Sequence, residues 1–150
     1  MIWNALAGFF DNLQGAQHAL WLLHQLYSTD KWIFEKKDGN GVYPLQYVLG
    51  HKCSACDHDG HTAARELIKI LLKAHPQSAR YMVQKRLAIH MAVENGWPCH
   101  DLLLAVFPEA LDQPDSKTDL LPFQTAAAAG LDITFELLLA NPTHVLRAQA

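Results

Sequence analysis

The fold is decided by the stretch Tyr43-Pro44-Leu45-Gln46-Tyr47-Val48, of which two modified copies follow: Leu87-Ala88-Ile89-His90-Met91-Ala92 and Leu121-Pro122-Phe123-Gln124-Thr125-Ala126. Each copy is followed by a leucine-rich stretch that stops at a proline, and these prolines are Pro76, Pro108 and Pro142. The prolines are 32 and 34 positions apart, and the last two copies are also 34 positions apart. A near-constant spacing of this size predicts a stack of small helical units rather than one closed core.

Each copy is expected to open the inner helix of a unit. Pro44 and Pro122 suit the first helical turn, where a missing amide donor costs nothing and the fixed φ is already helical. A glycine follows each copy, at Gly50, Gly96 and Gly130. We therefore predict short inner helices that end in left-handed glycine caps, after which the chain turns back.

Outer helices are expected to return from these glycines. Thr62, Pro98 and Asp132 are start signals in front of leucine-rich stretches. Their apolar stripes are wide, as expected where one helix contacts both its own partner and the next unit. Before the first unit, apolar residues at helical spacing predict two leading helices, at 3–10 and 16–27.

Composition is that of a well-packed domain. Half of the 150 residues are hydrophobic and 18% are charged. A net charge of −3 provides no basic field that would attract phosphate backbones, so we expect no nucleic-acid partner. The longest apolar run, around 19–23, is broken by His18 and His24, and we expect no membrane insertion.

Cysteine usage bears on the compartment. The chain has three cysteines, an odd number that does not suggest a disulfide framework. Its first residues lack the positive region of a secretory signal, and we interpret them as folded chain. The expected location is therefore intracellular, in the reducing cytoplasm.

Two segments carry a family resemblance, 86–96 and 121–130. Each combines a polar tip, an opening similar to Thr-Pro-Leu-His, small alanines and a glycine turn, and a leucine-rich outer helix follows. Over residues 35 to 145 the chain resembles an ankyrin repeat protein. The resemblance implies an all-α solenoid of three helix-turn-helix units behind an N-terminal cap. The expected divisions of a single domain, 1–150, are a cap of leading helices at 1–34, a first repeat at 35–80 with an insertion at 51–61, a second repeat at 81–113 and a third at 114–150.

The chain also departs from the family's pattern. Tyr43, Leu87 and Leu121 replace the threonine of the opening, and its histidine survives only as His90. The proline-ended variant resembles divergent ankyrin-like proteins of diatoms and related protists. A shared fold does not imply a shared function.

In ankyrin-like stacks the loop tips and inner helices form a concave binding surface, and the resemblance implies the same surface in this chain. Tyr, Met and Arg are enriched at interface cores, so we rank Tyr47, Arg86 and Met91 first. Trp32 and Trp97 are expected to pack between neighbouring units, because a tryptophan has a large area to bury, and a role as binding anchors is the alternative. The full set of predicted partner-binding residues is Lys36, Lys37, Tyr47, Lys85, Arg86, Met91 and Glu94.

The insertion in the first unit begins at His51 and carries Cys53, Cys56, His58 and His61. A Cys-x-x-Cys turn places two thiolates on one zinc ion, and histidines complete a tetrahedral set. The alternative is a solvated loop with reduced thiols, because short Cys- and His-containing tracts only suggest metal binding. We expect no cofactor and keep zinc at the insertion as the alternative.

Catalytic motifs are absent from the sequence: it has no phosphate-binding glycine loop, nucleophile elbow or metalloprotease helix. His90 is expected to stabilise the turn of its repeat rather than to act as a base. We therefore predict a non-catalytic scaffold or accessory subunit of a larger complex, which binds a protein partner. The alternatives are a metal-responsive domain whose insertion orders on zinc and a spacer within a longer polypeptide.

Overall fold

The computed structural model describes residues 2–9, 13–52, 61–128 and 137. Within these ranges the chain is mostly helical and contains no β-strand, which confirms the all-α prediction for this part. The elements, in chain order, are α1 (Ile2–Phe9), α2 (Leu13–Thr29), the 3-10 helix η1 (Lys31–Glu35), α3 (Pro44–Leu49), α4 (His61–Ala74), η2 (Pro76–Arg80), α5 (Ala88–Glu94), α6 (His100–Val106), η3 (Pro108–Asp112) and α7 (Pro122–Ala128).

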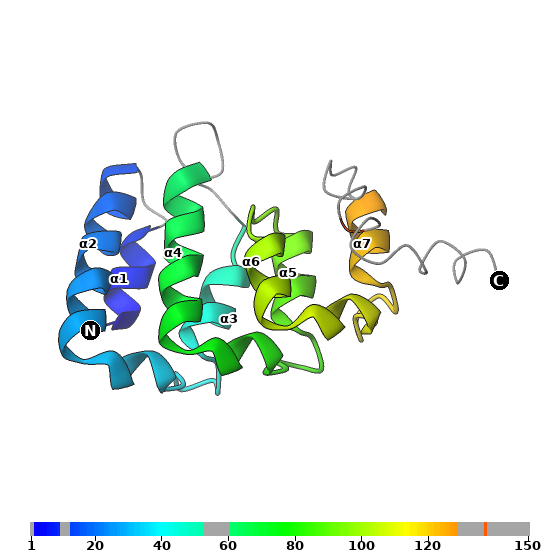
Figure 1. The fold of residues 1–150 in the computed structure, drawn as a ribbon, viewed down its shortest axis with the longest axis horizontal. Helices are drawn as coiled ribbons and strands as arrows, with labels where there is room; N and C mark the ends of the chain where they lie inside the picture. The colour runs from blue at the N-terminus through cyan, green and yellow to red at the C-terminus, as the bar shows by residue number, and fades with distance from the viewer. Residues whose placement is uncertain (1, 10–12, 53–60, 129–136, 138–150) are drawn as a thin grey trace.

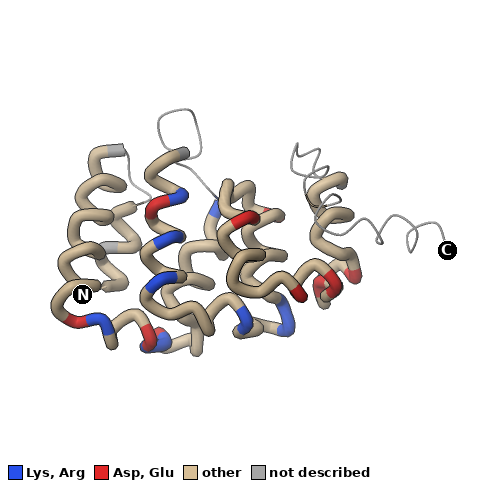
Figure 2. Tube along the Cα trace, viewed as in Figure 1, with Lys and Arg blue, Asp and Glu red and all other residues tan. Residues whose placement is uncertain are grey.

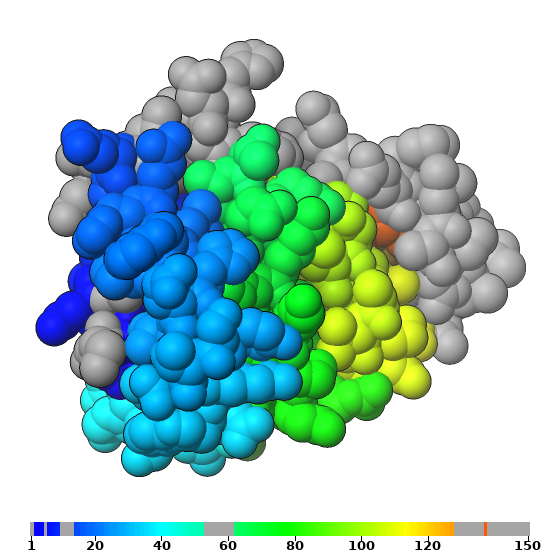
Figure 3. All heavy atoms as spheres, turned by 60° about the vertical axis from the view of Figure 1, so that its left-hand side comes forward, coloured from blue at the N-terminus to red at the C-terminus, as the bar shows by residue number. Residues whose placement is uncertain are grey.

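The helices lie in two layers. Helices α1, α3, α5 and α7 follow one another in the inner layer, and α2, α4 and α6 follow one another in the outer layer, each in contact with the next. Figure 1 shows these pairs side by side along the longest axis, with the 3-10 helices gathered at one edge. Figure 3 shows the same order as successive blue, green and yellow bands of atoms. We call the edge formed by residues 30–43, 75–87 and 107–121 the tip edge.

One backbone geometry recurs wherever an outer helix gives way to a 3-10 helix. The junction residues Asp30, His75 and Phe107 have φ angles of −133°, −147° and −141° and ψ angles of 54°, 78° and 77°. Pro76 and Pro108 then open η2 and η3, where their fixed φ fits the first turn. The predicted proline stops of the outer helices are therefore confirmed at these two positions, whereas the 3-10 helices were not predicted.

The left-handed glycine cap is confirmed at Gly96. Gly96 has a φ of +76°, a region that costs glycine nothing because it lacks a Cβ. The amide of Trp97 donates to the carbonyl of Ala92 at 2.9 Å, and the amide of Gly96 donates to Val93 at 3.4 Å. This pair of hydrogen bonds is the Schellman motif, and it turns the chain from α5 toward α6.

The same prediction is wrong at Gly50. This residue has a φ of −71°, which is right-handed, and its amide still donates to the carbonyl of Gln46 at 2.9 Å. The amide of His51 then donates to Val48 at 3.1 Å, so the chain leaves α3 through one further right-handed turn. Gly130 lies outside the described residues.

A hydrophobic core connects the two layers, from Ile2 to Leu137. Trp97 is 2% exposed, and its ring stacks on Phe9 with the centroids 6.3 Å apart. Its Nε1 donates a hydrogen bond of 2.7 Å to the carbonyl of His51. The predicted packing role is thus confirmed for Trp97.

The third residue of α3, α5 and α7 ties each of these inner helices to the tip edge. In α5 this residue is His90, which is 0% exposed. Its Nδ1 accepts from the Leu87 amide at 3.1 Å, and its Nε2 lies 2.7 Å from the carbonyl of Gln113. The imidazole is therefore neutral with its proton on Nε2. Burial lowers the pKa of His90 and favours this neutral form.

Glutamine takes the same place in α3 and α7. The Nε2 of Gln46 in α3 donates to the carbonyls of Ser78 and Tyr81 in the next turn. In α7, the Oε1 of Gln124 accepts from the Leu121 amide at 2.9 Å. The side chain at this position thus links the start of an inner helix to neighbouring backbone, whether it is histidine or glutamine.

Candidate interaction edge

The first turn of the tip edge is built on Asp38. Its carboxylate accepts from the amides of Asn40 and Val42 at 2.8 and 3.0 Å, and its own amide donates to Val42 at 2.9 Å. Gly41 supplies the left-handed φ, +77°, that the reversal requires. Asp38 therefore serves the turn itself.

The second turn holds two strained residues at its tip. Val83 and Arg86 exchange two backbone hydrogen bonds of 3.0 Å, which leaves Gln84 and Lys85 as a two-residue reversal. Both have left-handed φ angles, 53° and 64°, as a type I′ turn requires. Such turns favour Asn-Gly, because other side chains pay a steric penalty there. The exposed Lys85 is therefore held at an unfavourable backbone position.

The third turn is built on Asp115, which is 0% exposed. Its amide donates to the carbonyl of Leu120 at 2.8 Å, and its carboxylate accepts from the amide of Lys117 at 3.0 Å. Asp119 completes the reversal with a φ of 60°, in a region that aspartate tolerates better than most residues.

An ion-pair network joins the second and third turns. Arg86 contacts Asp115 through two hydrogen bonds of 2.8 Å, and its Nη2 also pairs with Glu94. Lys117 pairs with the other oxygen of Glu94 at 3.1 Å. The Arg86 side chain is only 14% exposed. Arg86 and Glu94 were both predicted to contact a partner. Arg86 is instead engaged with Asp115 and Glu94, and Glu94 is engaged with Arg86 and Lys117.

The network sets the charge state of its carboxylates. Burial raises the pKa of Asp115, but the hydrogen bonds from Arg86 and from the Lys117 amide outweigh it and hold that pKa below its ordinary value. Burial acts in the same way on Glu94, and hydrogen bonds from Arg86 and Lys117 likewise lower the pKa of Glu94. Both side chains are therefore ionised at neutral pH.

An aromatic cluster joins the first and second turns. The rings of Tyr43 and Tyr81 meet edge to face with centroids 4.8 Å apart, and His75 lies 4.7 Å from Tyr43. The hydroxyl of Tyr81 donates to the carbonyl of Gly41 at 3.2 Å. Lys37 extends over this cluster, with its Nζ 4.5 Å from the centre of the Tyr81 ring. The predicted tip residue Lys37 is thus held in place by cation–π contacts while the residue stays exposed to solvent.

Two of the predicted inner-helix contacts, Tyr47 and Met91, differ in exposure. Tyr47 is half-buried between Trp3, at 5.5 Å, and His51, at 5.0 Å. Met91 is 7% exposed and belongs to the core, which leaves a partner little of its side chain to contact.

Large apolar side chains are exposed at the tip edge. Trp32 is 53% exposed, so the prediction that it packs between units is wrong. The Nζ of the predicted contact Lys36 lies 4.6 Å from the centre of the Trp32 ring. Met82, one residue before the strained turn, is 46% exposed. The sequence did not single out Met82. For Trp32, the feature of the sequence that indicates exposure is Lys36, four residues later within a polar stretch.

Charge changes sign along the tip edge, as Figure 2 shows. The first segment is mixed, the second is purely basic, and the third is mostly acidic. The charged residues of these segments are Asp30, Lys31, Glu35, Lys36, Lys37 and Asp38, then Arg80, Lys85 and Arg86, then Glu109, Asp112, Asp115, Lys117 and Asp119.

The predicted zinc ligands are not placed by the structure. Cys53, Cys56 and His58 lie outside the described residues, as does the side chain of His61 at the start of α4. Among the residues that are described, no three His, Cys, Asp or Glu side chains are grouped so as to hold a metal ion. The remaining cysteine, Cys99, is buried, and burial raises the pKa of its thiol well above the ordinary value. Cys99 is therefore a core residue with an unreactive thiol.

Comparison with known proteins gives no relative: no family model, curated protein or solved structure matches the chain. None of the helices in the described ranges is long and apolar enough to cross a bilayer.

Proposed function

We propose that the chain is a non-catalytic, ankyrin-like protein-interaction module that binds a protein partner through the tip edge. The two-layered order of helix pairs and the recurring junction at Asp30, His75 and Phe107 support a repeat architecture. In such an architecture the fold is stabilised by packing between the inner and outer helices. The sequence of the turns can therefore differ according to the partner.

The observation that carries the proposal is the strained turn at Gln84 and Lys85. Non-glycine residues in the left-handed region cost on the order of 1 kcal/mol each, and such strain clusters at functional sites. The hydrogen bonds between Val83 and Arg86 and the ion pair of Arg86 with Asp115 hold the turn in this conformation. Lys85 is thereby presented on a rigid support, which reduces the entropy lost on binding.

The neighbouring side chains form a suitable contact surface. Trp32 and Met82 supply exposed apolar area, and aromatic residues and methionine are enriched at interface cores. Lys36, Lys37 and Lys85 supply positive charge beside them, which steers and orients a partner more than it adds affinity. Arg86 and Glu94 act in this proposal as supports for the turns.

The test is affinity capture from an extract of the source cells, read by mass spectrometry, with the unmodified chain and two variants as bait. Lys85→Glu reverses the charge at the strained tip, whereas Lys52→Glu makes the same change at an exposed position beyond the opposite end of α3. We expect a partner that is retained by the unmodified chain and by Lys52→Glu and is lost with Lys85→Glu. Equal capture by all three baits would contradict the proposal.

A further inference from the structure

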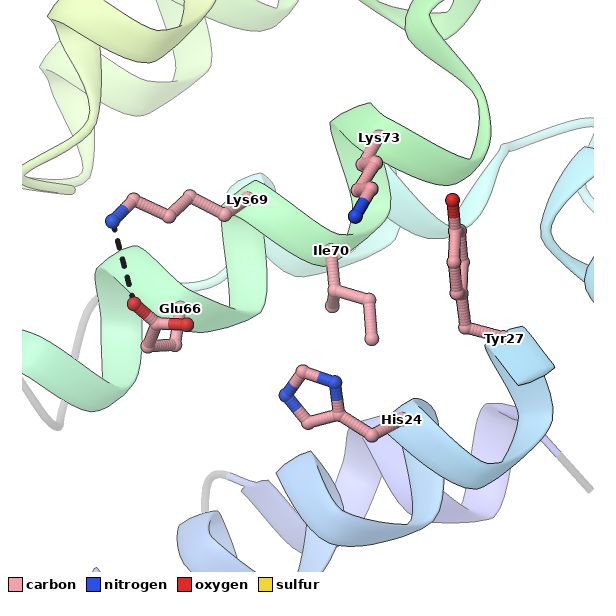
Figure 4. A pocket seen from close by; sticks show the side chains of 6 residues that line it. All are labelled: His24, Tyr27, Glu66, Lys69, Ile70 and Lys73. Atoms are coloured by element: carbon pink, nitrogen blue, oxygen red, sulfur yellow. Dashed lines mark hydrogen bonds and ion pairs between the residues drawn. The ribbon is translucent and has the colours of Figure 1, made fainter.

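A hollow lies on the outer layer between α2 and α4. Its volume is about 230 Å³, and it is open to solvent on one side. Figure 4 shows the side chains around it, with His24 and Tyr27 from α2 facing Ile70 and Lys73 from α4. The lining residues are His24, Tyr27, Glu66, Lys69, Ile70 and Lys73.

The floor and one wall of the hollow are apolar. Ile70 is 5% exposed, and the ring of Tyr27 stands beside it. Pockets for whole small molecules measure roughly 300–1,000 Å³ and enclose most of the ligand. This hollow is smaller and open, but an apolar cavity of about 150 Å³ already accepts a benzene ring. It therefore fits one large side chain of a partner rather than a free small molecule.

Positive charge lies beside Tyr27 at this hollow. The ammonium groups of Lys31 and Lys73 lie 5.2 and 5.4 Å from the centre of the Tyr27 ring. Lys69 is paired with Glu66 at 3.3 Å, so the single lining carboxylate is already neutralised. Among the described residues, Lys31 and Lys73 have no carboxylate partner within ion-pair distance. A complementary segment would carry carboxylates on either side of its apolar residue.

The hollow also lies next to the tip edge. Tyr27 is two residues before the end of α2, Lys73 is one residue before the end of α4, and Lys31 begins η1. A partner held at the tip edge can therefore reach the hollow with an adjacent part of its chain.

We propose that the hollow between α2 and α4 binds an acidic segment of the protein partner, with one aromatic side chain inserted between Tyr27 and Ile70 and flanking carboxylates on Lys31 and Lys73. The proposal rests on the protein-interaction function proposed above, for which it names a second contact. It also specifies the partner's chemistry: acidic residues around an aromatic anchor.

The experiment titrates the full chain with the synthetic peptide acetyl-Asp-Glu-Phe-Asp-Glu-amide. Calorimetry measures the affinity, and the NMR signal of the Ile70 methyl groups reports whether the hollow is occupied. One control peptide has Ala in place of Phe, and another has Lys in place of the four acidic residues. We expect a shift of the Ile70 signal, binding about tenfold weaker with the Ala peptide, and no binding of the Lys peptide.

Two protein variants complete the test. Lys73→Gln should weaken the affinity for the acidic peptide about two- to fivefold, as expected when an exposed ion pair is lost. Lys52→Gln should leave this affinity unchanged. An unshifted Ile70 signal at about 1 mM peptide, or equal affinities for the Phe and Ala peptides, would overturn the proposal. Lys85→Glu should not alter peptide binding, because Lys85 does not line the hollow. If the peptide does not bind, only the proposal for the hollow is overturned. Equal partner capture by all baits would instead overturn the proposed function of the tip edge.

Discussion

Arg86 and Asp115 form a two-point ion pair across the second and third turns, with both nitrogen–oxygen distances at 2.8 Å. Because Asp115 is 0% exposed and the Arg86 side chain is 14% exposed, the pair is shielded from water. It fastens two turns that are separated by all of α5, α6 and η3. The rigidity of the tip edge therefore depends on the charges of Arg86 and Asp115.

Asp115→Ala should lower the free energy of unfolding by about 2–4 kcal/mol, because it leaves Arg86 largely buried with one carboxylate partner fewer. It also removes the acceptor of the Lys117 amide. Urea denaturation near neutral pH measures the change. Arg86→Ala and the double variant complete a double-mutant cycle. If the two single effects simply add, the pair contributes nothing, contrary to the account.

His90→Gln should remove a pH dependence of stability while keeping the fold. Gln46 and Gln124 occupy the same position in their own helices, so glutamine can replace the ring there. The folded pKa of His90 lies below 6.5, hence the stability it provides is complete above that pH and is lost as the pH falls toward the folded pKa.

Denaturation curves at several pH values, from about 7 down to 5, test this prediction. The unmodified chain should lose up to about 1.4 kcal/mol per pH unit more than His90→Gln in this window. Parallel pH profiles for the two proteins would show that His90 does not titrate on unfolding.

The strained turn should be relaxed by its preferred residues. Gln84→Asn combined with Lys85→Gly should stabilise the chain by about 1–2 kcal/mol, because both left-handed positions become unstrained. The same variant should bind the partner more weakly, since it lacks the Lys85 ammonium group. Gln84→Asn alone is the control, with a smaller gain in melting temperature and unchanged partner capture. No gain in the double variant would mean that the turn stores no strain.

Gly96→Ala and Gly50→Ala form a matched pair. At Gly96 the φ of +76° makes alanine unfavourable, and we expect a loss of about 1 kcal/mol. At Gly50 the φ is right-handed, and a Cβ would meet the carbonyl oxygens of Gln46, at 3.2 Å, and Tyr47, at 3.7 Å. The cost there should be no more than about 0.5 kcal/mol. Thermal unfolding of both variants measures the two losses of stability. Equal losses would contradict the assignment of a left-handed cap to Gly96 and a right-handed exit to Gly50.

Helix positions were predictable because apolar spacing and proline act locally. Pro44 and Pro122 open α3 and α7 as expected, and the leading helices lie where the apolar pattern placed them. The 3-10 helices at Pro76 and Pro108 were missed, because a proline that ends an α-helix also suits the start of a tighter turn. The right-handed exit at Gly50 was missed because glycine permits both signs of φ.

The candidate site was harder to predict, since its contacts join residues far apart in the chain. The sequence marks Arg86 as a charged tip residue, but its partner Asp115 is 29 positions away and only the fold brings them together. Burial of Met91 and exposure of Trp32 likewise depend on the stacking of helices. Lys36, Lys37 and Lys85 were placed correctly at the turns, because polar turn signals are local.

The most direct test of the tip edge as the partner's contact surface is photo-crosslinking from single positions. A p-benzoylphenylalanine side chain would replace the exposed Met82 at the tip edge in one variant, and the exposed Lys52 beyond the opposite end of α3 in another. If the partner binds the tip edge, illumination in an extract of the source cells should join one partner protein to the chain from position 82 and not from position 52. Crosslinking of that partner from position 52, with none from position 82, would contradict this prediction.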